Sequence, residues 1–241
     1  MGKLKDMING IDQSKDTERE IGEQLKVLTA LGETKVEIFK AEIEASLKDG
    51  KTMDDLKVPI TKVLGSFEEY RAYTTRTQEK LMEDVSESIT TMFGGGVNNI
   101  VSGVSSLVTK GLNVILGAGS GEEMMKKEYY IVVEYPAIIR YDIAMWTRNV
   151  SVRSLQERMN NIIACVAYKS AVDVTKLDFN TFLGCYSAVL REGFGDNKAD
   201  IKNMIAEAGE VFGMFQQGGK RGKAEERELN LYTDMVCNKM V

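Results

Sequence analysis

The chain of 241 residues is long enough to bury a sizeable core, and 43% hydrophobic and 28% charged residues are ordinary for a folded protein. Its formal net charge of -5 argues against a nucleic-acid partner, because neutralising phosphates requires a dominant basic surface. Histidine is absent, which excludes Ser-His and Cys-His nucleophile pairs and His-containing metal sites. We therefore expect no catalytic, cofactor-binding or metal-binding residues and no enzyme activity.

The three cysteines, Cys165, Cys185 and Cys237, are isolated in the sequence and form no CxxC spacing, so a metal or redox site is not expected. Cys165 and Cys185 fall in apolar patterns and are expected to be buried free thiols. The apolar run at the N-terminus is too short for a secretory signal peptide. We expect synthesis in the cytoplasm, with release to a membrane by another route if the protein acts elsewhere.

The N-terminal part of the chain shows helical periodicity. Apolar residues recur at three- and four-residue steps over residues 14–49, which predicts a long helix that Gly50 closes. A second long helix is predicted over residues 52–93, with Pro59 in its early turns. Because a short turn joins them, the two helices should lie antiparallel as a hairpin over residues 1–93.

Residues 94–121 form an apolar segment that carries one charge, Lys110, and has glycines at both ends. The stretch 97–116 has apolar residues at helical spacing opposite Asn, Ser and Thr, and reaches the minimum length of a membrane-spanning helix. The candidate membrane-inserting residues are Val97, Ile100, Val101, Val104, Leu107, Val108, Leu112, Ile115 and Leu116. Glycine tolerates large backbone changes, so the candidate hinge residues are Gly94, Gly95, Gly96, Gly117, Gly119 and Gly121.

The rest of the chain is also predicted to be helical. Residues 129–146 are rich in aromatic and β-branched residues that would suit a strand, but no convincing second strand is evident to pair with it. We therefore expect a buried helix kinked at Pro136. Capping residues predict further helices after Ser154, Asp178 and Asn197.

These elements predict an all-α fold, an elongated bundle of long amphipathic helices with an apolar helical insert. The expected parts are the hairpin over 1–93, the hinged insert over 94–121, a C-terminal helical part over 122–217, and a linker and tail helix over 218–241. We expect them to form one compact unit.

This organisation resembles that of the α-helical pore-forming toxins of the cytolysin A and haemolysin BL type. The resemblance covers the long helices up to about residues 49 and 93 and the insert 94–121, and it transfers no individual functional residue. It implies a helical-bundle toxin whose apolar tongue is sheltered in the soluble state and then inserts into a membrane, with protomers assembling into an oligomer.

The apolar face of the insert should be shielded from water by protein or lipid, since fully burying one such side chain is worth roughly 1.5–3 kcal/mol. One hypothesis is a membrane-interacting, pore-forming protein that releases residues 97–116 into lipid and self-associates, with or without a second protein component. The alternative is a soluble scaffold or interaction protein of a larger assembly, in which the same helix belongs to the core. A translocator-like partner of a secretion system is a third possibility.

Overall fold

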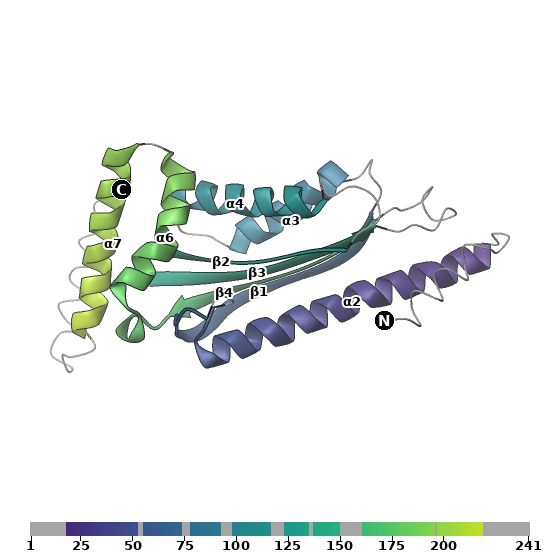
Figure 1. The fold of residues 1–241 in the computed structure, drawn as a ribbon, viewed down its shortest axis with the longest axis horizontal. Coiled ribbons are helices and arrows are strands. Elements are labelled where there is room, and N and C mark those ends of the chain that lie inside the picture. The colour runs from purple at the N-terminus through teal and green to yellow at the C-terminus, as the bar shows by residue number, and fades with distance from the viewer. Residues whose placement is uncertain are drawn as a thin grey trace.

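A four-stranded antiparallel sheet with strand order β1-β4-β3-β2 forms the centre of the protein (Figure 1). The computed structural model describes residues 18–52, 55–73, 78–92, 98–116, 123–134, 137–149, 161–195 and 197–218. The strands are β1 (Ile60–Tyr73), β2 (Glu123–Glu134), β3 (Ala137–Asn149) and β4 (Asn161–Val172). Each neighbouring pair is antiparallel.

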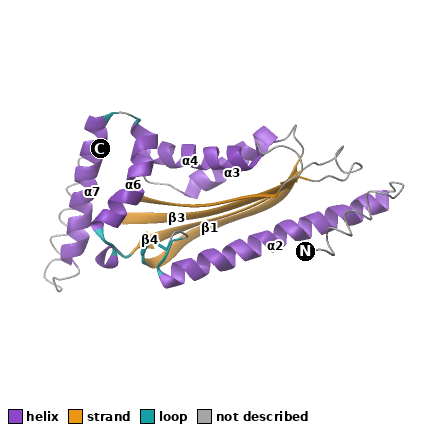
Figure 2. Cartoon of the chain, viewed as in Figure 1, coloured by secondary structure: helices purple, strands orange, loops and turns teal. Residues whose placement is uncertain are grey.

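Helices cover both faces of the sheet and one of its ends (Figures 1 and 2). The long helix α2 (Glu18–Asp49) lies on one face, and α3 (Gln78–Met92) and α4 (Asn98–Leu116) lie on the other. A short 3-10 helix (Val174–Lys176) leads into α6 (Phe179–Phe194), which crosses the end of the sheet, and α7 (Lys198–Gly218) packs against α6.

The prediction of an all-α helical bundle is therefore wrong. The described residues form a four-stranded antiparallel sheet as well as helices, so the fold is mixed α/β. The expected N-terminal helical hairpin is also wrong, because β1 replaces the first half of the second predicted helix. Register shifts between Ile60 and Lys62, and again between Val63 and Gly65, mark bulges in β1. A bulge interrupts the alternation of side chains between the two faces of a strand. Ile60 and Val63 therefore lie on the same face although they are three residues apart, a spacing that is typical of a helix.

The predicted helix over residues 129–146 is a hairpin of two strands. Tyr130 pairs with Tyr141, and Glu134 pairs with Ala137 beside the connection. Both faces of β3 are buried, and apart from the buried Arg140 and Asp142 its residues from Ala137 to Trp146 are apolar, so no exposed polar face identifies it as a strand. The same reason explains why β4 was expected to be helical. Pro136 and Ser154 lie outside the described residues.

Several helices are confirmed. Helix α2 ends at Asp49, and Gly50 follows with a φ of 67°, the left-handed conformation that glycine adopts most easily. Asp178 caps α6 by accepting a hydrogen bond from the backbone N–H of Thr181. The helix predicted over residues 97–116 is α4. The predicted linker and tail helix lie outside the described residues beyond Gly218.

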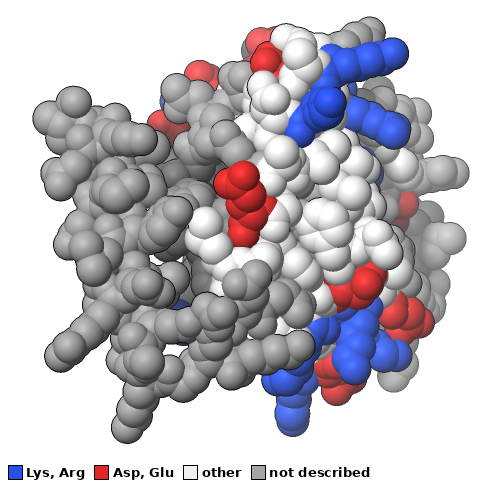
Figure 3. Space-filling view, turned by 90° about the vertical axis from the view of Figure 1, so that its left-hand side faces the viewer, with Lys and Arg blue, Asp and Glu red and all other residues white. Residues whose placement is uncertain are grey.

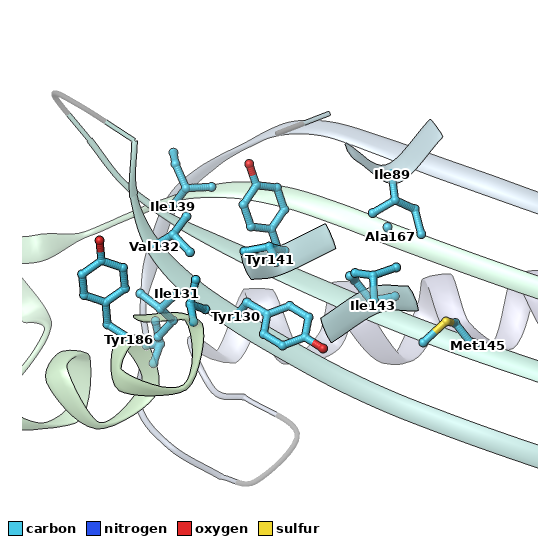
Figure 4. Close-up of a cluster of buried hydrophobic side chains, with 14 of the residues drawn as sticks. Ile89, Tyr130, Ile131, Val132, Ile139, Tyr141, Ile143, Met145, Ala167 and Tyr186 are labelled. Carbon is cyan, nitrogen blue, oxygen red and sulfur yellow. The ribbon is translucent and has the colours of Figure 1, made fainter. Parts of the chain in front are cut away.

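The sheet separates two hydrophobic clusters. Toward α2, Phe39 and Ile43 pack with Trp146 of β3. Toward α3 and α4, Ile89 packs over Ile143 and its neighbours in the sheet, as Figure 4 shows. Each helical layer therefore buries the apolar face of its helices against a sheet that is apolar on both sides.

A buried ion pair joins the sheet to the end of α2. The guanidinium of Arg140 donates to both carboxylate oxygens of Asp142, at 2.8 and 2.7 Å, and neither side chain is exposed. It also donates to the backbone oxygen of Val58 at 3.0 Å and to the hydroxyl of Ser46 at 2.9 Å. These contacts hold the segment between α2 and β1 against the sheet. Burial raises the pKa of Asp142, although the guanidinium acts in the opposite direction.

Candidate interaction site at an open sheet edge

Strand β1 lies at one edge of the sheet and is 14 residues long. Its inner side pairs with β4, from Ile60 opposite Val172 to Tyr73 opposite Asn161. No other strand of the described residues pairs with its outer side. At about 3.3 Å per residue, the edge extends over roughly 45 Å. The edge therefore presents a long row of backbone N–H and C=O groups that no described strand pairs with.

Exposed apolar side chains accompany these backbone groups. Of the large apolar residues that are exposed in the described part of the chain, three lie on β1: Val63 at 44%, Leu64 at 43% and Tyr70 at 40%. Val63 and Leu64 are adjacent, at the second bulge of the strand. Single exposed apolar residues are common, but a group of them on an open strand edge is typical of an interaction surface.

Both flanking helical layers hold β1 in place. On one face, Arg71 forms ion pairs with Glu69 at 2.9 Å and with Asp84 of α3 at 3.0 Å. On the other face, Lys40 of α2 pairs with Glu68 at 3.0 Å. The nearby Glu68 and Glu37 raise the pKa of the Lys40 ammonium. The protein's own contacts thus position the strand. Because β1 is already ordered, it loses little conformational entropy when a partner strand binds.

The opposite edge of the sheet is different, because α6 crosses it near the end of β2 (Figure 1). A hollow of about 550 Å³ lies there between β2, α6 and the segment around Leu56. Its polar side chains bind one another or their neighbours: Tyr130 donates to Glu128 at 2.6 Å, and Lys127 donates to Glu42 at 2.7 Å. Burial is the main cause that raises the pKa of Tyr130, and the hydrogen bond to Glu128 raises it further.

Helices α6 and α7 form one end of the molecule; in the described part of this view, Figure 3 shows mainly uncharged side chains, with Lys and Arg toward the margins and several Asp and Glu side chains among them. Within the described residues, no group of three or more His, Cys, Asp and Glu side chains is placed to hold a metal ion.

Those of the predicted membrane-inserting residues whose side chains the structure describes lie on α4 and face the core. Val104, Val108, Leu112 and Ile115 are at most 1% exposed, and Leu116 is 8% exposed. Leu107 is partly buried against the same cluster. Val97 and the side chains of Ile100 and Val101 lie outside what the structure describes, as do the hinge candidates Gly94, Gly95, Gly96, Gly117, Gly119 and Gly121. The sheet and neighbouring helices therefore cover the described part of the apolar face.

The small polar face of α4 also contacts neighbouring helices. Lys110 donates to both carboxylate oxygens of Glu192 in α6, at 2.7 and 2.8 Å, and Ser106 donates to the same carboxylate. These contacts hold the pKa of Glu192 below its ordinary value. At Gly103, an added Cβ would lie 2.8 Å from the backbone oxygen of Val189, so only glycine allows this close approach of α4 and α6.

These contacts bear on the functional predictions. The mixed α/β fold contradicts the expected class of all-α, helical-bundle pore-forming toxin. No helix in the described segments is long and apolar enough to cross a membrane. Membrane association, release from the cytoplasm and a second protein component stay predictions, which no contact in the structure tests.

Comparison with protein-family models and with curated proteins found no match to this chain.

The edge of β1 was not recognised from the sequence. A signal was nevertheless present in residues 67–73, where side chains point alternately to α3 and to α2. The bulges before Gly65 interrupted that alternation in the first half of the strand.

Proposed function

We propose that the protein is an interaction component of a larger assembly, and that it recruits a partner by adding the partner's strand to the outer edge of β1. The single observation that carries this proposal is the long strand edge, unpaired by any described strand, with Val63 and Leu64 exposed on it. In strand addition, main-chain hydrogen bonds provide affinity, and alternate side chains provide specificity.

The position of β1 between two layers supports the proposal. Tyr73 is buried at the end of the strand, and Phe67 packs against the core on the side of α3 and α4. A strand held by its own core keeps its shape when a partner binds, so little ordering is needed at the edge. The burial of α4 supports its role as a core helix of such a protein.

Site-specific photo-cross-linking tests this proposal. A benzophenone amino acid replaces Leu64 on β1 and, in a matched control, replaces Val114, an aliphatic residue of α4 that is 54% exposed. Both variants are irradiated in the cells that produce the protein, and the cross-linked peptides are identified by mass spectrometry. We expect discrete adducts at position 64, with few at position 114.

The location of the adducts on the partner gives a second readout. Strand addition requires that the partner peptide at position 64 comes from one extended segment, whereas random collisions give scattered peptides. A folded protein that gives no adduct at position 64 above the level at position 114 would refute the proposed function.

A further inference from the structure

We infer that the partner strand is β1 of a second copy of this chain, antiparallel to the first and related to it by a two-fold axis at Ser66. This inference rests on the proposed function of the β1 edge and identifies its partner. The result is a symmetric dimer in which two four-stranded sheets join into one continuous sheet.

The side chains of β1 determine which residues can lie opposite one another. The β4 partners of Lys62, Ser66 and Glu69 are Ala171, Tyr168 and Cys165. Ala171 and Cys165 are each three positions from Tyr168, so Lys62 and Glu69 are equally far from Ser66 along the ladder. Six ladder positions separate Lys62 from Glu69, and because this number is even, the two side chains lie on the same face of the sheet.

A two-fold axis at Ser66 therefore places Lys62 of each copy opposite Glu69 of the other. The bulge between Val63 and Gly65 makes this match possible, because Lys62 is four residues from Ser66 in sequence but only three positions away along the ladder. Lys62 is exposed and forms no ion pair with a described residue, whereas Glu69 already lies 2.9 Å from Arg71. Each Lys62 would join the Glu69–Arg71 pair of the other copy.

The same axis gives favourable apolar pairs. Gly65 and Phe67 are each one ladder position from Ser66, so each glycine lies opposite an aromatic ring of the other copy. Ile60 and Tyr70 are each four positions from Ser66 and also lie opposite one another. Aromatic and β-branched side chains stabilise antiparallel strands when they are paired in this way.

Neighbouring registers are less favourable. An axis at Phe67 places Lys62 opposite Arg71, which puts two like charges together. An axis at Gly65 places Lys62 opposite Phe67, where it has no charged partner. Of these three registers, only the axis at Ser66 places Lys62 opposite a residue of opposite charge.

Pairing at β1 through a two-fold axis uses the same edge on both copies, so this pairing closes at two chains and leaves no further β1 edge. We expect a dimer of twice the 26.8 kDa chain mass and no fibre.

Sedimentation equilibrium of the full chain tests the dimer and its register. The mass of the wild-type protein should rise with concentration from that of one chain to that of two. Variant K62E places two acidic residues opposite one another, and E69K places two basic residues opposite one another. Each variant alone should have a dimer dissociation constant about tenfold or more higher.

An equimolar mixture of K62E and E69K restores both opposite-charge pairs in a heterodimer, so the mass of two chains should return. This rescue separates loss of pairing from loss of folding, because a misfolded variant cannot be rescued by mixing. Failure of the mixture to dimerise, while both variants keep the wild-type circular dichroism and the wild-type protein dimerises, would overturn the register.

A disulfide at the axis gives an independent readout. In variant S66C, which also carries C185S and C237S so that fewer native thiols can react, the two introduced thiols face one another within disulfide reach. Mild oxidation should give a covalent dimer, and T61C in the same background should give much less. A wild-type protein that stays monomeric at all concentrations overturns the inference; if position 64 then cross-links to a different protein, the proposed function still stands.

Discussion

Replacing Arg140 with methionine should strongly destabilise the protein. The guanidinium makes two hydrogen bonds to Asp142 and one each to the Val58 carbonyl and the Ser46 hydroxyl, all within 3.0 Å. Methionine has a similar length but can make none of them. The carboxylate of Asp142, which is 0% exposed, would then be left buried without its counter-charge.

The expected loss follows from this uncompensated charge. Removing one partner of a buried ion pair costs about 3–5 kcal/mol of unfolding free energy. For a chain of this size, each kcal/mol corresponds to about 2–4 °C in melting temperature, so the expected decrease is about 6–20 °C. Replacing both residues, in R140M/D142L, also removes the unpaired buried carboxylate. It should cost only about 1–3 kcal/mol, mainly because the Val58 carbonyl loses its partner.

The loss should also depend on pH. Burial already raises the pKa of Asp142, and removing the guanidinium raises it further above that of the unfolded chain. A carboxyl whose pKa is higher in the folded state binds more protons there, so folding is favoured as pH falls. The difference in stability between wild type and R140M should therefore shrink as pH is lowered from 7 toward the unfolded Asp pKa of about 3.9.

Urea denaturation followed by tryptophan fluorescence measures these effects. Trp146 is the single tryptophan and is fully buried against α2, so its emission reports the unfolding of this side of the sheet. Measurements at pH 7 and pH 4.5 cover wild type, R140M and R140M/D142L. A single variant within 1 kcal/mol of wild type at pH 7, or a double variant no more stable than the single, would refute the reasoning.

Three further predictions concern buried positions. Ser170→Ala should stabilise the protein by about 1 kcal/mol in urea, because the buried Ser170 hydroxyl has no hydrogen-bond partner among the described residues; a loss of stability would contradict this. Cys165 should resist iodoacetamide in the native protein while the partly buried Cys185 reacts, because burial raises the pKa of Cys165 to about 12; peptide mass spectrometry showing equal labelling would argue against it. Gly103→Val should lower the unfolding free energy by about 1–3 kcal/mol, since its Cβ would press on the Val189 carbonyl; an unchanged melting temperature would exclude this contact.

The helices were predictable from local signals. Helix α2 shows a regular apolar stripe and a closing glycine, and α6 begins at the capping side chain of Asp178. The periodicity of α4 was also recognised, with bounds close to those observed. Each of these signals lies within the segment itself, so no knowledge of distant residues was needed.

The strands were not predictable in the same way. Residues 137–149 and 161–172 are buried on both faces, and burial on both sides removes the polar alternation that identifies a strand. The bulges of β1 shifted its apolar residues to a helical spacing. Without recognised strands no sheet was expected, so lipid and other helices were the two environments considered for the apolar face of α4.

The sequence by itself determined the helical periods, the caps, the absence of histidine chemistry and the low charge of residues 94–121. It could not determine what covers that segment, because the sheet residues that bury Val108 and Leu112 come from other parts of the chain. The strand order was equally hidden, since it depends on pairing between residues far apart in sequence. The open edge of β1, and with it the proposed interaction site, exists because β1 is the terminal strand among the described strands and pairs on one side only, with β4.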